Sequence, residues 1–322
     1  RGFYSFVLYC LLYIFSLGAE LLCNDKPLFV VYQSEHFFPL LVSYPETDFG
    51  GVFETETDYN DPFFQEIMDE PGNWAIYPPI RYNFNTINYM IDGPVPSPPT
   101  RDNILGTDDR GRDVFARLLY GFRVSALFGL ALTAVGTIIG ILAGAVQGYL
   151  GGRTDLLFQR FIEIGGSMPE LSLLIIFASI FQPSLLLLLM LLSLFSWMGL
   201  SDYVRAEFLK GRNMEYVTAA RALGVSNLVI MYRHLLPNGL TPVITFLPFR
   251  MSASILALTS LDFLGLGVPP STPSLGELLA QGKANIDAWW LSLSTFAVLV
   301  GTLILLIFIG EGLRETFDPR KR

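Results

Sequence analysis

The sequence predicts an all-α polytopic membrane protein with six transmembrane helices and a domain inserted after the first helix. Hydrophobic residues make up 52% of its 322 residues, and the mean hydropathy is +0.46, which is more apolar than a soluble domain. Several apolar runs are long enough to cross a hydrocarbon layer of about 30 Å. A long acidic stretch follows the first apolar run and differs from the rest in composition. These three observations define the fold class.

The six spans are expected at about 3–22, 124–149, 167–182, 185–205, 240–262 and 290–311. The third is short and follows Pro169. The fifth contains Pro242 and Pro248, which a membrane helix tolerates where its neighbours satisfy the freed backbone groups. We expect the first span to be retained, because it is long for a signal peptide and no small-residue cleavage site follows it. The chain opens on Arg1 instead of Met, so we expect cytoplasmic residues to precede it.

Basic residues predict the orientation, because Lys and Arg near span ends resist translocation. They gather in the connection 150–160, in the loop 205–234, and in the tail Arg320, Lys321 and Arg322. Six spans then place both termini and these loops in the cytoplasm, and residues 23–123 in the periplasm. The net charge of −8 describes this exported part and does not indicate nucleic-acid binding.

The periplasmic insert, 23–104, combines carboxylates and aromatic residues with many turn formers. Short β segments are expected, for example at 28–33 and 74–82, and the Pro-rich run 94–100 is expected to be a stiff linker. Two interpretations fit together: a folded cap with a small aromatic core, and a docking surface for a periplasmic partner. The carboxylates face only Lys26 as counter-charge; they are Asp25, Glu35, Glu46, Asp48, Glu54, Glu56, Asp58, Asp61, Glu66, Asp69 and Glu70.

Residues 105–123 are expected to form an amphipathic helix in the membrane interface before the second span. A turn and helix cap at Gly106, Thr107 and Asp108 would begin it. Apolar residues then recur at helical spacing while three arginines face elsewhere: Val114, Leu118, Leu119 and Phe122 against Arg112, Arg117 and Arg123.

Four glycines lie on one face of the second span, at Gly136, Gly140, Gly144 and Gly148. Such a ridge permits close packing of two helix backbones. Packing within one subunit is favoured over a dimer interface, and both remain open at this point.

Charged residues in or near spans are costly in a membrane and suggest functional roles. Glu163, Asp202 and Arg205 are expected at the interface, where they would hold loops. Arg250 lies within the fifth span and Asp262 at its end, so these two are candidates for lining the transport pathway.

The sequence argues against an enzyme. Gly276 to Lys283 approximates a phosphate-binding loop, but five residues separate its glycines where four are needed, and Ala284 replaces the Ser or Thr that would hold Mg²⁺. The two histidines, His36 and His234, fall on opposite sides of the membrane, so they cannot share a metal. Cys10 and Cys23 are too far apart along one helix to form a disulfide. We therefore expect no catalytic residue, no metal and no cofactor bound by this chain.

A polar, helix-prone segment, 215–238, lies between two apolar spans and ends in Leu-Pro. We expect a short helix from about Glu215 to Leu223, ended by Gly224. Its small side chains would let another protein approach closely, as a membrane subunit driven by a soluble motor requires. The candidate contact residues are Glu215, Tyr216, Thr218, Ala219, Ala220, Arg221, Gly224, Leu236 and Pro237.

This segment resembles the EAA loop of ABC-importer permeases: Ala219, Ala220, Gly224, Leu236 and Pro237 fall in register, and Thr218 stands where the family usually has Glu. Three further blocks, 105–121, 258–279 and 310–319, resemble the dipeptide/oligopeptide branch of that family.

The resemblance implies a type I permease fold with a permease core over 124–322 and an EAA loop at about 207–238. It implies import of oligopeptides, and peptide-like antibiotics are a possible further cargo. The implied partners are a second homologous permease, two ATPase subunits or one fused ATPase carrying ATP and Mg²⁺, a periplasmic peptide-binding protein, and membrane lipid.

Two alternatives to a peptide importer remain. One is an ABC importer for another solute, such as nickel or an oligosaccharide. The other is a secondary transporter working alone, which predicts inverted repeats and an ion-coupling acidic residue at mid-bilayer; neither is clear in the sequence.

Overall fold

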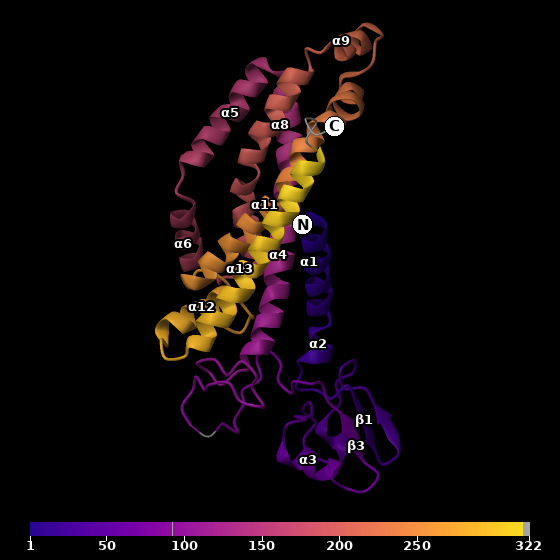
Figure 1. The fold of residues 1–322 in the computed structure, drawn as a ribbon, viewed down its shortest axis with the longest axis vertical. Coiled ribbons are helices and arrows are strands. Elements are labelled where there is room, and N and C mark those ends of the chain that lie inside the picture. The colour runs from indigo at the N-terminus through magenta and orange to yellow at the C-terminus, as the bar shows by residue number, and fades with distance from the viewer. Residues whose placement is uncertain (92, 318–322) are drawn as a thin grey trace. The chain divides into compact units, whose positions relative to one another are not determined.

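A computed structural model describes residues 1–91 and 93–317 (Figure 1). Two compact units emerge. The first contains Arg1–Cys10, Ser125–Pro269 and the chain from Val300 onward; the second contains Leu11–Val124 and Pro270–Leu299. The basic tail Arg320, Lys321 and Arg322, and the end of the block 310–319, lie outside the described residues.

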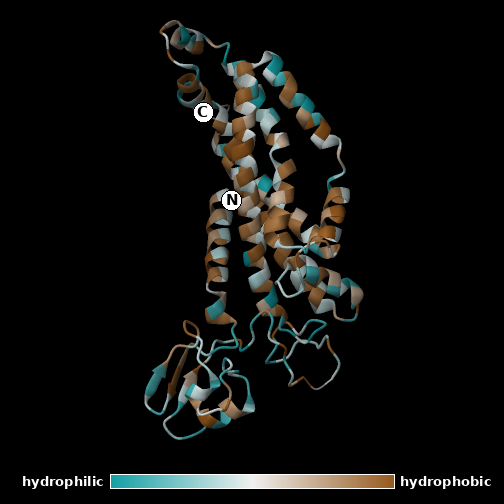
Figure 2. Cartoon of the chain, turned by 180° about the vertical axis from the view of Figure 1, so that it is seen from behind, coloured by the Kyte–Doolittle hydropathy of each residue, from teal (hydrophilic) through white to brown (hydrophobic). Residues whose placement is uncertain are grey.

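Helices dominate the described residues, and four helical stretches among them are long and apolar enough to cross a membrane. They are α4 (Val114–Leu150), α7 with α8 (Leu185–Ser196 and Met198–Gly211), the stretch Asn227–Phe263, and α13 (Trp289–Phe317). The stretch Asn227–Phe263 comprises α10 (Asn227–Val229), a π-helical turn η2 (Ile230–Leu235) and α11 (Leu236–Phe263). Brown, hydrophobic residues cover much of these helices in Figure 2.

The remaining two expected spans differ from the prediction. In place of a span over 167–182, α5 (Gly152–Ser167) and α6 (Glu170–Ile180) meet at a bend of 71°, which is either a broken span or a re-entrant loop. Pro169 explains the break, because the residue before a proline is driven out of the helical conformation. The first apolar helix, α1 (Gly2–Leu17), has 16 residues and is short for a span. The described chain therefore has four or five candidate spans by length and composition.

The core of the first unit joins α4 to the helices that follow it. Phe128 and Leu132 of α4 pack with Leu188 of α7 and with Leu258 and Leu261 of α11. Further toward the C-terminal end of α4, three glycines of the ridge, Gly140, Gly144 and Gly148, lie against α8. A Cβ on Gly144 would lie 2.5 Å from the carbonyl oxygen of Ser201, and one on Gly148 would lie 2.5 Å from that of Arg205. Any side chain at these positions would push the two backbones apart.

The second unit contains a three-stranded antiparallel sheet in the order β2-β1-β3. Its strands are β1 (Phe29–Tyr32), β2 (Glu35–Phe37) and β3 (Trp74–Ile76), with Val30 paired to both Phe37 and Ala75. The hairpin between β1 and β2 turns at Gln33 and Ser34, both with positive φ, which suits a tight two-residue turn.

One face of this sheet covers a small aromatic core. Val30, Phe49, Tyr59 and Phe64 are its buried members. Phe49 belongs to the 3-10 helix η1 (Glu46–Phe49) and Phe64 to α3 (Pro62–Met68), whose first turn is capped by the Asp61 carboxylate. The folded cap with an aromatic core that the composition predicted is therefore confirmed, although its strands are shorter than expected.

The expected interfacial helix over 105–123 is wrong in two respects. Residues 105–113 are not helical, and 114–123 are the first turns of the continuous helix α4. Asp113, not Asp108, caps this helix by accepting a hydrogen bond from the Ala116 N–H at 2.8 Å. Arg117 does not face a polar surface: its side chain is fully buried.

Two small helices complete the second unit. The short helix α2 (Ala19–Leu22) packs Ala19 against Ala116 and Tyr120 of α4. Helix α12 (Leu275–Ala284) starts at Ser274, whose hydroxyl accepts from the Gly276 and Glu277 N–H groups. The stretch that approximates a phosphate-binding loop, Gly276 to Lys283, is therefore helical throughout.

Candidate functional site

The segment expected to receive a partner protein forms a helix, α9 (Glu215–Ala222), close to the predicted bounds. Gly224 ends it with φ of +77°. The Val225 N–H donates to the Ala220 carbonyl and the Gly224 N–H to the Arg221 carbonyl. These two bonds form a Schellman motif, in which only glycine adopts the left-handed position without strain.

One side of α9 is fixed to the rest of the first unit. Val217 and Ala220 are buried in a cluster with Val204 and Phe208 of α8 and Val243 of α11. Ala220 therefore lies on the inner side of the helix and is not available to a partner, contrary to its place among the predicted contact residues. The helical periodicity of the sequence did not show that Ala220 is buried and Ala219 exposed, because both side chains are small.

Tyr149, at the end of α4, bonds to residues on both sides of the turn that ends α9: Arg221 before it and Asn227 after it. Its hydroxyl donates to the Asn227 side-chain oxygen at 2.7 Å, and Arg221 donates to the same hydroxyl at 3.4 Å. The Arg221 guanidinium also lies over the Tyr149 ring, 5.8 Å from its centroid. The sequence interpretation missed Tyr149, since nothing local marks it; its partners lie more than seventy positions away.

The other side of α9 is exposed. Thr218, Ala219 and Ala222 are exposed, and Leu223 is 84% exposed. Leu228 and Tyr232 beyond the turn are also exposed, at 77% and 74%. Large apolar side chains exposed together in α9, its terminal turn and the helical turns that follow indicate an interaction surface. We call Thr218, Ala219, Ala222, Leu223, Leu228 and Tyr232 the outer face.

The expected loop over 207–238 is shorter in the structure. Residues up to Gly211 belong to α8, and the chain is helical again from Asn227. Pro237 lies in the first turn of α11, directly after the π-helical turn η2. Leu236 packs against the same buried cluster as Val217, while Pro237 is exposed. Glu215 and Tyr216 are exposed at the start of α9.

The two pathway candidates have different surroundings. Asp262 is buried, and its carboxylate accepts a hydrogen bond from the Val268 N–H at 2.9 Å. Gly267 lies so close that a Cβ there would overlap this carboxylate, so Asp262 closes the turn after α11. Arg250 is half-buried, and its Nη2 donates to the Ser196 carbonyl at 2.8 Å. The structure brings Arg250 beside Gly136 of the glycine ridge.

The structure also shows the contacts of the three charged residues that were expected to hold loops. Arg205 forms a bidentate pair with Asp155 of α5, with N–O distances of 2.5 and 2.7 Å. Asp202 accepts a hydrogen bond from the Gln159 side chain, so two contacts fix α5 to α8. Glu163 pairs with Arg160 on the exposed surface of α5.

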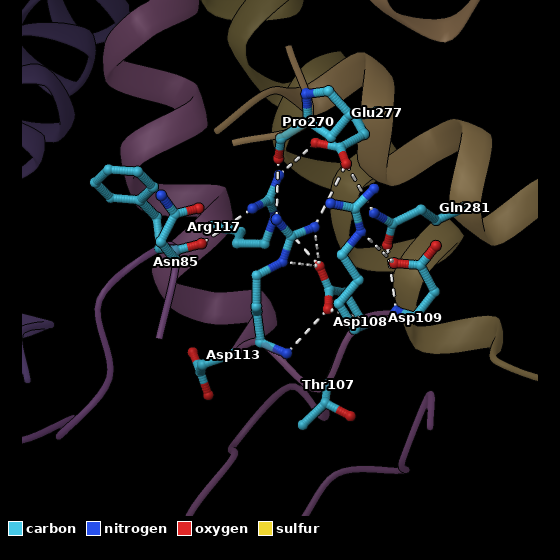
Figure 3. Close-up of polar contacts among 12 residues, drawn as sticks. Asn85, Thr107, Asp108, Asp109, Asp113, Arg117, Pro270, Glu277 and Gln281 are labelled. Atoms are coloured by element: carbon cyan, nitrogen blue, oxygen red, sulfur yellow. Dashed lines mark hydrogen bonds and ion pairs between the residues drawn. The ribbon is translucent and has the colours of Figure 1, made fainter. Parts of the chain in front are cut away.

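A buried charge network in the second unit was not foreseen (Figure 3). The Asp108 carboxylate accepts from the Arg112 Nε at 2.7 Å and lies 3.5 Å from the Arg117 Nε. Glu277 of α12 pairs with Arg112 at 3.4 Å and with Arg117. The network joins the loop before α4, the first turns of α4 and helix α12, which lies about 160 positions later in the chain.

Backbone groups and an amide complete this network. Arg112 donates to the Pro270 carbonyl at 2.9 Å, Arg117 donates to the Phe84 carbonyl at 3.0 Å, and Gln281 donates to Glu277 at 3.1 Å. Burial raises the pKa of Glu277, and the charges of Arg117 and Arg112 oppose that rise. The residues around Glu277 do not reveal this pairing, because its partners Arg112 and Arg117 are distant in the sequence.

Known proteins with similar sequences identify the family. Residues 136–322 match the family described as "Binding-protein-dependent transport system inner membrane component". The chain is 50% identical over 321 residues to the "Inner membrane ABC transporter permease protein YejE" of Escherichia coli (strain K12), covering 100% of this chain and 94% of that protein.

Other relatives agree. The "Peptidoglycan transport system permease protein YejE" of Agrobacterium fabrum (strain C58 / ATCC 33970) is 50% identical over 345 residues, covering 100% of this chain and 90% of that protein. The "Oligopeptide transport system permease protein OppC" of Haemophilus influenzae (strain ATCC 51907 / DSM 11121 / KW20 / Rd) is 36% identical over 221 residues, 68% of this chain and 71% of that protein.

Membership in such a family has direct consequences. A binding-protein-dependent transport component works with a binding protein and an ATPase, and it is itself a multi-pass inner-membrane subunit, not the ATPase. The chain belongs to the family of binding-protein-dependent transport system inner membrane components, as an ABC transporter permease similar to YejE.

Proposed function

We propose that this permease imports oligopeptides and is driven by its ATPase through the outer face of α9. The observation that supports this most is the two-sided character of α9. Val217 and Ala220 fix one side of the helix within the subunit, while the residues of the outer face are exposed, with Leu223 at 84%.

A helix held in this way transmits force. A push on the outer face would pass through Val217 and Ala220 to α8 and α11, because all of them share one packed cluster. Packed interiors move as units and do not deform continuously. ATP and Mg²⁺ would bind on the ATPase subunits, and this chain would supply only the contact and the moving spans. The ATPase pair would have to hold the outer face in both of its states for the coupling to work.

The proposed topology has six crossings, with α1 and the α5–α6 pair added to the four long stretches. Support for α1 comes from its packing: a Cβ on Gly2 would lie 2.8 Å from the Gly312 Cα of α13, so the two backbones meet there. Residues 23–104 would be periplasmic and both termini cytoplasmic, as the distribution of Lys and Arg indicates. A second homologous permease would complete the pathway.

The substrate class follows from the relatives. Those named above include an oligopeptide permease and a peptidoglycan transport permease. We therefore propose oligopeptides, with peptidoglycan fragments that carry peptide as the second candidate. Uptake of a labelled tripeptide and of a labelled disaccharide-peptide, each with and without this subunit at matched membrane levels, would distinguish them. Subunit-dependent uptake of neither compound would contradict the proposal.

The coupling role has a direct test in Leu223→Asp. Leu223 is exposed and is not a member of the buried cluster, so the change should leave the fold intact. A charge in an apolar contact should weaken ATPase binding by about tenfold or more, because the unpaired carboxylate is desolvated there. Co-purification of the ATPase with the tagged permease from detergent, together with peptide uptake, measures the effect.

The matched control is Leu41→Asp, an identical change at a leucine of the insert that is 80% exposed. It should leave ATPase co-purification unchanged. Normal ATPase recovery and uptake with Leu223→Asp would refute the role given to α9. Ala220→Asp is less informative, because Ala220 is buried within the subunit and its loss of function would report misfolding.

A further inference from the structure

Arg250 is a charged side chain inside the candidate span Asn227–Phe263, and no carboxylate of residues 1–91 and 93–317 pairs with it. Its Nη2 donates to the carbonyl of Ser196, the last residue of α7, and no Asp or Glu of the described chain lies within ion-pair distance of its guanidinium. The end of a helix supplies about half a negative charge. That partial charge leaves the guanidinium incompletely balanced in an apolar surrounding, where charge is expensive.

Further polar atoms beside it also lack partners. The Arg250 Nε and the Ser196 hydroxyl are both shielded from solvent, and neither forms a hydrogen bond within the part of the chain that the structure describes. Buried donors are normally satisfied, and each one left unpaired costs free energy. The unpaired Nε of the charged guanidinium and the unpaired Ser196 hydroxyl together form a site that lacks an acceptor.

Gly136 packs directly against this point. A Cβ added there would lie 2.8 Å from the Arg250 Nη2 and 2.5 Å from the Ser196 hydroxyl oxygen. Any larger residue would therefore press on the guanidinium and on the Ser196 hydroxyl. Arg250 as a whole is only half-buried, so part of its side chain lies at the surface of this chain, next to the two shielded donors.

We propose that Arg250 and Ser196 bind the carboxylate of the transported solute, the C-terminal carboxylate when that solute is a peptide. This inference rests on the proposed function. The guanidinium presents its Nε and a terminal nitrogen as a planar fork that matches the two oxygens of a carboxylate. The Ser196 hydroxyl donates a further hydrogen bond to the same group. The bound carboxylate supplies the missing negative charge and satisfies both unpaired donors.

The test compares a tripeptide with its C-terminal amide in proteoliposomes that contain the whole complex and its binding protein. The ratio of the two uptake rates is the readout. The wild-type complex should prefer the free acid, and Arg250→Gln should reduce that preference by about tenfold, the worth of a charged hydrogen bond. Because the binding protein is the same in every sample, a change in the ratio belongs to the permease.

Three variants sharpen the result. Arg250→Lys keeps the charge without the fork and should keep part of the preference. Ser196→Ala removes the hydroxyl but keeps the carbonyl that Arg250 contacts, so it should lower the preference while the helix contact survives. Arg160→Gln removes a charge from an exposed pair and should leave the ratio unchanged.

Some outcomes would overturn the inference. If Arg250→Gln slows both peptides equally, Arg250 only caps α7. If the wild-type complex takes up acid and amide at equal rates, the site does not bind a carboxylate. If it takes up neither, the proposed peptide function fails first. Should Arg250→Gln not assemble with its partners, the ratios for Arg250→Lys and Ser196→Ala decide, and unchanged ratios in both contradict the proposal.

Discussion

Arg117 is a fully buried cation whose charge is balanced by Asp108 and Glu277. Removing one member of a buried ion network leaves the others uncompensated, at a cost of about 3–5 kcal/mol. We expect Arg117→Gln to lower the thermal midpoint of the detergent-solubilised protein by several degrees or to prevent its accumulation. Size-exclusion chromatography after heating to a series of temperatures measures this midpoint.

Arg160→Gln provides the comparison, because it breaks an ion pair on the surface of α5. Exposed pairs contribute about 0–1 kcal/mol, so the midpoint should barely move. Equal shifts for the two variants would mean that the network around Arg117 adds no more than a surface pair.

Single residues show where sequence reasoning reaches its limit. Gly224 was correctly predicted to end α9, because the requirement for a left-handed residue is local. Ala220 was predicted among the contact residues, yet it is buried within the subunit, and two neighbouring alanines gave no sign of which one faces inward. Glu277 was missed altogether: its role is defined by arginines about 160 positions earlier, and no local pattern reports such a pairing.

At the level of elements, the contact between α4 and α8 depends on the absence of side chains. Gly144→Ala would place a methyl group 2.5 Å from the Ser201 carbonyl oxygen and 2.7 Å from the Val204 Cβ. Overpacking of this kind costs about 1–3 kcal/mol. We expect a lower yield of folded protein and a lower thermal midpoint, measured by the same chromatography.

Gly301→Ala is the matched change in α13, where nothing lies within 4 Å of an added Cβ. Alanine has the higher helix propensity, by about 1 kcal/mol in a soluble helix, so this variant should be as stable as the wild type or slightly more stable. A harmless Gly144→Ala would show that α4 and α8 separate easily.

Elements were predicted well where periodicity and length suffice, as for α4, α11 and α13. The separate interfacial helix over 105–123 failed for a physical reason. Arg112 and Arg117 suggested a solvated face, yet both are buried because carboxylates from the preceding loop and from α12 satisfy them. The sequence shows the charges but not which distant charges meet them.

For the whole molecule, the proposed topology predicts which exposed positions face which compartment. We expect Leu41→Cys to react with a membrane-impermeant maleimide added to spheroplasts, and Leu223→Cys to react only after the membrane is opened. Both leucines are highly exposed in this chain, so in cells that express the permease without its ATPase and binding protein, accessibility depends on the compartment alone. Mass spectrometry of the purified protein measures the fraction labelled.

The native cysteines set the background of this experiment. Burial raises the pKa of the Cys23 thiol to about 12, so at pH 7 it stays protonated and unreactive. Cys10→Ala removes the other free cysteine. Labelling of Leu223→Cys in intact spheroplasts would invert the proposed orientation and place α9 away from any cytoplasmic ATPase.

At the scale of the whole molecule, composition predicted the helical membrane class, and the resemblance of 215–238 and three further blocks to known permeases predicted the family, while the orientation stays a prediction. The number of crossings did not follow from the sequence, because a bend of 71° at Pro169 and a 16-residue first helix depart from the uniform spans that hydropathy suggests. The pairing of Arg250 with the end of α7 also required coordinates, since Ser196 and Arg250 are 54 positions apart.

The π-helical turn at Ile230–Leu235 has a consequence for how this protein tolerates changes in length. A wide turn of this kind accommodates one residue beyond the regular helical repeat. Deleting one residue there should tighten the turn to an ordinary repeat, with α9 and α11 keeping nearly the same rotational phase. A deletion within the regular part of α11 would instead rotate everything beyond it by about 100°, and Arg250 would turn away from Ser196 if the deletion lay before it.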